Sequence, residues 1–177
     1  MVTLPLCLEA IFAEYPQPEQ VFQNLLPGVG DVLNVDRCFL EIRQPIDRCY
    51  RIFCWRRSDQ FPDLTTDGWQ PEQPWEQEDP LFEAALRAEP SIFVEDIETA
   101  NPEVLNLNFE QQSFGHRALI HAHIRETGTL WGILQPCVFE HPRVWSPFDR
   151  AVIHTLTTRL LPWVKAYAEL SRELICH

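Results

Sequence analysis

Cysteine and histidine side chains that could act together occur in the second half of the chain. His121 and His123 alternate along one predicted strand, so both rings lie on the same strand face, and Cys137 falls on the adjoining predicted strand. A thiolate beside an imidazole base, for which His141 is a further candidate, is the arrangement of a thiol-dependent enzyme. A His-x-His pair on a strand is more often exposed or locally hydrogen-bonded, so this enzyme hypothesis ranks last.

His116 and Arg117 offer a different chemistry at the start of the same strand. The guanidinium of Arg117 could bind a carboxylate or propionate group of a ligand. The more common alternative is a surface arginine that pairs with one of the many acidic side chains.

The other cysteines show no spacing typical of a metal site. The six cysteines stand at positions 7, 38, 49, 54, 137 and 176, without a CxxC pair. Most are therefore expected to be buried as small apolar residues. The predicted first hairpin places Cys38 roughly opposite Phe53 or Cys54, but a Cys38–Cys54 redox switch is disfavoured because cytoplasmic thiols usually stay reduced.

The second half of the chain predicts a hairpin followed by a helix. Residues 118–124 and 130–139 have strand length and composition, and residues 126–129 supply a glycine-containing turn. From Ser146 the apolar residues recur every three or four positions, which predicts a helix that Ser146 caps with Pro147 at its first position. The predicted buried face consists of Phe148, Val152, Ile153, Leu156, Leu160, Val164, Tyr167 and Leu170.

The first half predicts a helix, a second hairpin and a long loop. A helical stripe covers residues 21–33, although Pro27 is expected to bend or interrupt it. Strands are predicted over residues 37–43 and 49–56. Residues 58–80 are rich in Pro, Asp, Glu and Gln, which is typical of a loop.

Two tryptophans and a short helix complete this part of the chain. Trp69 and Trp75 lie in the polar loop, where they either pack back on the domain or anchor a partner protein. Asp79 and Pro80 then begin a short helix, and residues 91–94 form the next strand.

The order of motifs in the C-terminal half resembles that of a GAF domain of the phytochrome and cyanobacteriochrome kind. The matching residues are Leu130-Trp131-Gly132, Pro142-Arg143, Trp145 and Pro147-Phe148-Asp149, with weaker matches at 114–120, 94–97 and 35–37. The resemblance covers most of residues 20–170. It implies one domain over residues 1–177 with an α+β fold, in which N- and C-terminal helices flank a central antiparallel sheet of about six strands.

The resemblance also indicates where a ligand pocket would lie. Members that carry a bilin attach it through a cysteine, usually followed by a histidine, and hold it with another histidine after the Leu-Trp-Gly motif. These positions read Asn106, Leu107 and Cys137 here, and an amide cannot form a thioether. Asp96, His116 and Arg117 complete the ligand-pocket candidates. With 11 Phe, 6 Trp and 3 Tyr, a pocket collapsed onto aromatic side chains is expected, and an open cavity of roughly 300 Å³ or more would count against it.

Composition restricts the classes of partner. The 177 residues carry a net charge of −12, which disfavours binding to nucleic acids and anionic lipids. No apolar run approaches the roughly 20 residues that cross a membrane, and the N-terminus resembles no secretory signal, so a cytoplasmic protein is expected. Neither a metal nor another cofactor is predicted.

Three functions compete at this stage. The first is a stand-alone, non-catalytic regulatory or protein-interaction module with a degenerate chromophore pocket, which acts through an unidentified partner in a cyanobacterium-like photosynthetic organism. The second is a sensor that binds a bilin or another small ligand without a covalent bond. The third is the thiol-dependent enzyme. A homodimer through the terminal helices is also predicted, although Pro162 argues against one straight final helix.

Overall fold

A computed structural model describes residues 3–175, apart from the side chains of residues 75, 76 and 173–175. Its strands are β1 (Arg37–Gln44), β2 (Cys49–Arg56), β3 (Gln70–Pro71), β4 (Ile92–Val94), β5 (Ala118–Glu126) and β6 (Thr129–Val138). Its helices are α1 (Leu6–Glu14), α2 (Pro18–Leu33), the short 3-10 helix η1 (Pro74–Gln77), α3 (Pro80–Leu86), α4 (Leu107–Ser113) and α5 (Pro147–Ile175).

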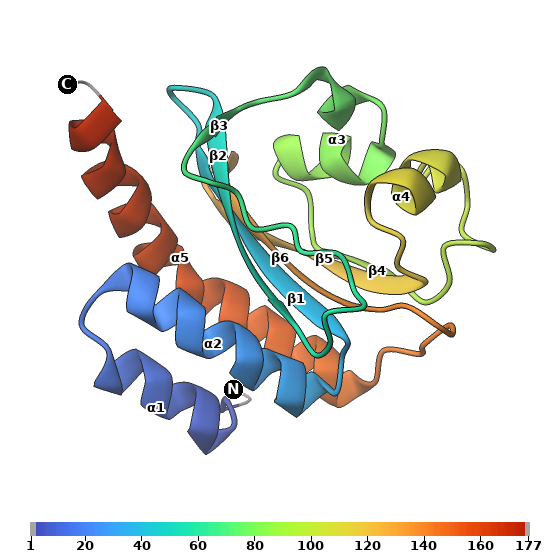
Figure 1. Cartoon of the computed structure of the whole chain (residues 1–177), viewed down its shortest axis with the longest axis horizontal. Coiled ribbons are helices and arrows are strands. Elements are labelled where there is room, and N and C mark those ends of the chain that lie inside the picture. The colour runs from blue at the N-terminus through green and yellow to red at the C-terminus, as the bar shows by residue number, and fades with distance from the viewer. Residues whose placement is uncertain (1–2, 176–177) are drawn as a thin grey trace.

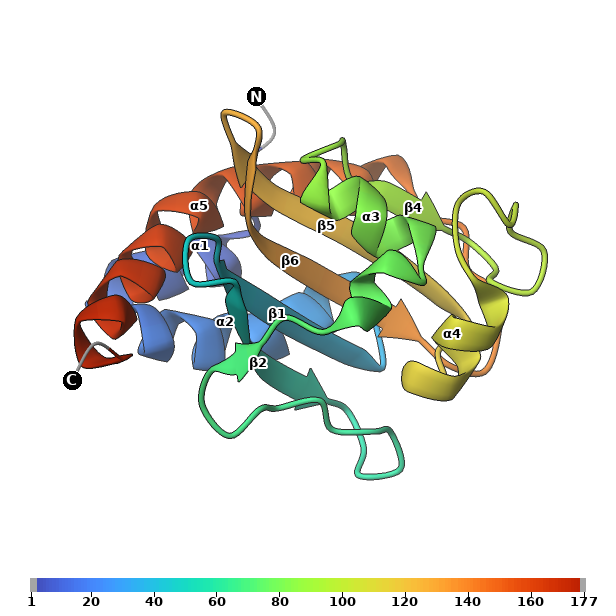
Figure 2. The same ribbon diagram turned by 90° about the horizontal axis from the view of Figure 1, so that it is seen from above.

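The strands form one antiparallel sheet that separates two layers of helices. The strand order is β3-β2-β1-β6-β5-β4, with β1 and β6 at the centre. Helices α2 and α5 cover one face, with α1 outside them, whereas α3 and α4 lie over the other face (Figures 1 and 2). The expected α+β fold with a six-stranded sheet is confirmed. No helix within residues 3–175 is both long and apolar enough to cross a membrane.

The predicted hairpin of β5 and β6 is confirmed, and its turn explains the glycine. Glu126 pairs with Thr129, so the turn consists of Thr127 and Gly128 alone. Both residues have positive φ angles, 47° and 77° respectively. Two-residue turns of this hand match the twist of the flanking strands, and glycine adopts them without steric strain.

Helix α5 begins as predicted, although its buried face is shorter than expected. The Ser146 hydroxyl accepts a hydrogen bond from the Asp149 amide at 3.1 Å, and the Asp149 carboxylate accepts one from the Ser146 amide at 2.9 Å. This reciprocal cap fixes the first turn. The prediction was wrong for Phe148 and Leu170, which are 52% and 55% exposed.

Prolines do not end either long helix. Helix α2 continues through Pro27, so of the two expected effects, a bend or an interruption, the interruption does not occur. Its buried side chains, including Leu25, Leu26 and Val29, pack on the sheet and hold the helix together. Helix α5 likewise continues through Pro162, and Figure 1 shows it changing direction between its orange first part and its red second part.

The register of β1 and β2 corrects the predicted cysteine pair. Cys38 lies opposite Trp55, and Cys54 lies opposite Phe39. Cys38 is buried in the core beneath α2 and α5, whereas Cys54 packs with the cluster on the other sheet face. Adjacent strand positions point to opposite faces, so the two thiols are not placed to form a disulfide. Burial raises the pKa of Cys38 well above its usual value, which keeps this thiol unreactive.

Candidate functional site

The two faces of the sheet differ in chemistry. The face beneath α2 and α5 is the large apolar core, with Leu40, Ile42 and Leu134 among its members. The face beneath α3 and α4 carries buried polar side chains on three neighbouring strands: Arg37, Glu41, Arg43, His121, His123 and Gln135. Burying polar groups is unfavourable unless they are paired. We therefore expect a functional site on this second face.

One part of this polar face is an ion network at the end of β1. Arg43 donates to Glu41 at 2.6 Å and also pairs with Glu72. Glu72 in turn accepts from Arg48 at 2.9 Å, at the turn between β1 and β2. The network satisfies the charges of buried Glu41 and Arg43 and fixes the loop after β3 against the sheet.

A second network runs from β1 to α3. The fully buried guanidinium of Arg37 donates to the carbonyl of Pro62 at 3.1 Å and lies 3.5 Å from Nδ1 of His116. The other ring nitrogen of His116 is hydrogen-bonded to the buried carboxyl of Glu110 on α4. Glu110 is in turn hydrogen-bonded to Asp79, the N-cap of α3. Four buried polar residues thus link a central strand to both helices above it.

The two carboxyl groups at the end of this network influence each other. Burial, together with the hydrogen bond and charge of Glu110, raises the pKa of Asp79 to about 8. Burial also raises the pKa of Glu110, although Asp79 and Arg37 partly oppose that rise. A neighbouring like charge and removal from water both favour the protonated form of a carboxyl group.

The residues at the predicted attachment position are structural. The side chain of Asn106 caps α4 by accepting from the Phe109 amide at 3.2 Å, and its amide group donates to the Glu78 carbonyl at 3.0 Å. Leu107 packs in a small apolar cluster with Ile97 and Leu105. Neither side chain can act as a nucleophile.

Arg117 and Asp96 bind each other. The Arg117 guanidinium makes two hydrogen bonds to the Asp96 carboxylate, at 2.7 and 3.1 Å, and a further ion pair to Glu98 at 3.0 Å. This pairing lowers the pKa of Asp96. Although Arg117 follows His116 in sequence, it lies at the partly exposed edge of the domain, where the surface pairing considered above is formed. The structure does not bring Arg117 and His116 into one pocket.

The predicted thiol and imidazole groups lie on neighbouring strands, Cys137 on β6 and the two histidines on β5, but no hydrogen bond joins the thiol to either ring. Cys137 is buried in the cluster of Val94 and Leu119. His121 and His123 bond to each other at 2.8 Å, and Nδ1 of His123 donates to the Glu89 carbonyl at 2.7 Å. Burial lowers the pKa of both histidines, well below the usual value for His121. His141 is exposed. The arrangement in the described part of the chain gives Cys137 no base.

Aromatic rings fill much of the space between the sheet and α3 and α4. Phe114 stacks on Phe39 and on Phe82, each with 6.1 Å between ring centroids, and meets Phe109 edge-on at 6.0 Å. The His116 ring also stacks on Phe114, with 5.4 Å between ring centroids. This is the aromatic filling that the composition led us to expect.

The filling is incomplete, because a cavity of about 450 Å³ opens beside the rings. Its volume exceeds the roughly 300 Å³ set as the limit above, which counts against a complete collapse of the pocket onto aromatic side chains. The cavity lies between β2, the following loop and α4, and is lined by Tyr50, Ile52, Leu64, Thr66, Glu78, Phe109, Gln112, Ser113 and Phe114. None of these nine residues is Lys, Arg or His.

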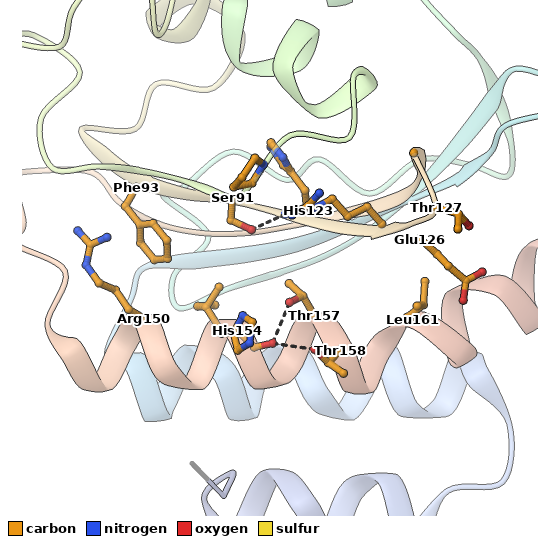
Figure 3. Close-up of a pocket in the computed structure, with 14 residues that line it drawn as sticks. Ser91, Phe93, His123, Glu126, Thr127, Arg150, His154, Thr157, Thr158 and Leu161 are labelled. Carbon is orange, nitrogen blue, oxygen red and sulfur yellow. Dashed lines mark hydrogen bonds between the residues drawn. The ribbon is translucent and has the colours of Figure 1, made fainter. Parts of the chain in front are cut away.

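A second opening, of about 620 Å³, lies at the opposite edge of the sheet. Figure 3 shows Ser91, Phe93 and His123 above this groove and His154, Thr157 and Thr158 of α5 below it. The hydroxyls of Thr157 and Thr158 both donate to the His154 carbonyl. None of the residues predicted for the ligand pocket lines the groove.

The structure describes the side chain of only one of the two tryptophans that were considered as partner anchors. Trp69 is half-buried and stacks on Tyr167 of α5, with 5.9 Å between ring centroids, so it packs back on the domain. The side chain of Trp75 lies outside the part of the molecule that the structure describes.

Several residues of the polar face were not recognised from the sequence. Arg37, Glu41 and Arg43 alternate with apolar residues along β1, which is the usual pattern of a strand with one solvent-facing side. Only the three-dimensional position of α3 and α4 shows that they are buried. Asp79 was recognised as a helix start, but nothing in the spacing indicated its contact with Glu110. Within residues 3–175, no group of three or more His, Cys, Asp or Glu side chains could hold a metal ion.

Comparisons with known proteins bear on the fold. No family model matches the sequence, and no curated protein matches it either. Among solved structures, the phycoerythrobilin-bound GAF domain of a cyanobacterial phytochrome is similar with a TM-score of 0.70 and 16% identity, over 97% of this chain and 100% of that one.

Two further solved structures are GAF domains of phosphoenolpyruvate-protein phosphotransferases. The domain from Acinetobacter has a TM-score of 0.66 and 11% identity, over 94% of this chain and 95% of that one. The domain from Coxiella burnetii has a TM-score of 0.66 and 18% identity over the same shares. At this level of identity, the likeness establishes that the chain has the fold of a GAF domain.

Proposed function

We propose that the chain is a non-catalytic GAF regulatory module that forms no covalent bilin adduct and acts through a protein partner. The observation that carries this proposal is the filling of the face beneath α3 and α4 by Phe82, Phe109, Phe114 and the network of Arg37. In addition, Asn106 is used as a helix cap and offers no thiol.

The setting we propose is cytoplasmic signalling in a photosynthetic organism. The likeness to the GAF domain of a cyanobacterial phytochrome supports this setting. Leu6 on α1 and Leu170 on α5 are 87% and 55% exposed, which supports an apolar contact through the terminal helices with a partner or a second copy. Sedimentation across a concentration series tests self-association. Leu170→Glu should weaken a dimer, Leu86→Glu on α3 should not, and a constant monomer mass would exclude the dimer.

The test of the chromophore proposal is an absorption spectrum. The protein is purified from cells that make phycocyanobilin or biliverdin, and one sample is denatured. We expect no visible band in either sample. A band that survives denaturation would overturn the proposal, whereas a band lost on denaturation would favour a photosensor with a non-covalent bilin.

The cavity beside the aromatic rings favours a second candidate function, the sensing of a small ligand. Its lining combines Ile52, Leu64 and Phe109 with the polar groups of Thr66 and Gln112. The only charged lining residue is Glu78, so the cavity suits an uncharged or cationic apolar molecule better than a bilin, whose propionates need a cation.

A library of small uncharged and cationic aromatic compounds tests this candidate. Leu64→Trp fills the cavity, whereas Leu86→Trp adds the same ring at a partly exposed position outside it. A ligand of the cavity raises the melting temperature of the wild type and of Leu86→Trp but not of Leu64→Trp. Equal shifts in all three proteins would place the binding elsewhere.

A further inference from the structure

The hydrogen bonds that the described residues make around Asp79 leave one of its two carboxyl oxygens without a partner. Oδ1 of Asp79 accepts from the Asn106 amide at 2.9 Å and from the Leu81 amide at 3.4 Å. Oδ2 is buried and has no N–H or O–H donor among the described residues, yet the carboxyl group is hydrogen-bonded to that of Glu110. Two carboxylates can form a hydrogen bond only when one of them is protonated. Since both amide donors occupy Oδ1, we assign the proton between the two acids to the side of the orphaned Oδ2 of Asp79.

The rest of the network fixes the charge of Glu110. A guanidinium only donates hydrogen bonds, so Nδ1 of His116, which faces Arg37, is an acceptor. Nε2 of His116 then carries the hydrogen and donates it to Glu110. Glu110 thus receives two donors and is the one anion that balances the buried Arg37 cation. With its proton, the network is neutral; without it, the network holds a second buried negative charge.

We propose that Asp79 and Glu110 hold one shared proton, and that release of this proton moves α4 away from α3 and opens the sheet face beneath them. Asp79 is placed to cause such a movement, because its Oδ1 holds the amides of Leu81 in α3 and Asn106 at the start of α4. Ionisation of Asp79 therefore adds a charge at the point where α3 and α4 both begin. Since α4 contributes Phe109, Gln112 and Ser113 to the cavity lining, the movement also widens the cavity.

Among the side chains that the structure describes, no further cation lies beside the second charge, and the Asn106 and Leu81 amides oppose the rise in the pKa of Asp79 only in part. Arg37 of β1 already balances Glu110, and His116 uses its Nε2–H to donate to Glu110. His121 of β5 lies under α3 with its ring 5.0 Å from that of Phe82, and burial lowers its pKa, which keeps it neutral. Glu78, which precedes Asp79, adds a negative charge. The pKa of Asp79, raised to about 8, places the release of the proton within a mildly alkaline range.

Asp79→Asn tests the proposal, because asparagine keeps the acceptor oxygen and replaces the titrating hydroxyl with an N–H donor. Amide hydrogen exchange of α4 is followed in the full chain from pH 6.5 to 9.5 and corrected for intrinsic rates. Above pH 8 the wild type loses protection of α4 by about tenfold per pH unit, whereas β1 and β6 stay protected. Asp79→Asn shows no such loss, and the exposed control Glu103→Gln behaves like the wild type.

Infrared spectroscopy gives a readout of the proton itself. The wild type at pH 6.5 shows the carbonyl band of a buried protonated carboxyl group, and this band disappears on alkaline titration and is absent from Asp79→Asn. Equal exchange of α4 at every pH in the wild type, or the absence of the band, overturns the proposal. If Asp79→Asn does not fold, the titration of the wild type by both methods decides alone.

Discussion

Gly132 lies directly against the backbone of Glu41, so that a β-carbon on Gly132 would stand 2.7 Å from the Glu41 carbonyl oxygen. Gly132 is the third residue of the Leu-Trp-Gly motif and pairs with Ile42 across the centre of the sheet. The approach joins two central strands, neither of which can shift without disturbing its other neighbour. The close packing of the two strands therefore explains why the third residue of the motif is a glycine.

Gly132→Ala is expected to destabilise the domain by about 1–3 kcal/mol, because the backbone of β1 or β6 must move. Urea unfolding measures the change. Ile133→Val, at the next position, provides a scale, since removing one buried methylene typically costs about 0.5–1.5 kcal/mol. A change below about 0.5 kcal/mol for Gly132→Ala would mean that the sheet absorbs the β-carbon.

Phe114→Ala is expected to cost about 3–5 kcal/mol, because this buried ring touches the rings of Phe39, Phe82, Phe109 and His116. Phe148→Ala is the control, since Phe148 is half-exposed on α5. The two variants are compared by urea unfolding. Equal effects would show that the rings over the sheet do not form a packed layer.

The buried histidines make the domain sensitive to acid. Burial lowers the pKa of His121 and His123, so the folded state binds protons only at a lower pH than the unfolded chain does. The corresponding stability is fully present above the unfolded value of about 6.5 and is lost as the pH falls through it, by at most about 1.4 kcal/mol per pH unit and histidine.

His121→Phe removes one of these groups and keeps a ring against Phe82. Its free energy of unfolding should fall less between pH 7 and pH 5.5 than that of the wild type, whereas the exposed control His154→Gln should follow the wild type. Parallel pH profiles for all three proteins would show that His121 does not contribute.

Ser146→Ala is expected to destabilise the domain by about 1 kcal/mol, since it removes the acceptor for the Asp149 amide at the start of α5. Thr158→Ala, at an exposed position inside the same helix, is the control and should change stability by less than about 0.5 kcal/mol. Thermal unfolding of the three proteins distinguishes the cap from an ordinary hydroxyl. An effect no larger than the control's would mean that Asp149 alone holds the first turn.

The elements of the fold could be predicted because local chemistry marks them. The turn at Thr127 and Gly128 and the cap at Ser146 each need particular residues at fixed spacing. The continuation of α2 through Pro27 could not be predicted in this way. It depends on side chains that become buried only when the sheet is in place, and this packing outweighs the lost hydrogen bond.

The candidate site was less accessible to sequence reasoning for a similar physical reason. The charges of Arg37 and Glu41 read as solvent-facing because α3 and α4, which bury them, lie far along the chain. Arg117 and Asp96 were candidates for binding a ligand, but in the structure they form an ion pair with each other at the partly exposed edge of the domain. Asp79 and Glu110 are 31 positions apart in the sequence, and neither their residue types nor their spacing indicates that their carboxyl groups lie against each other.

The two faces of the sheet belong to separate layers of side chains, so substitutions on them have different consequences. Side chains under α2 and α5, such as Leu40 and Leu134, hold the sheet to its helices, and their substitution endangers folding itself. Those under α3 and α4, such as Phe39 and Phe114, form a separate cluster on the other side. A substitution in that layer can therefore alter the lining of the cavity without removing a contact between the sheet and α2 or α5.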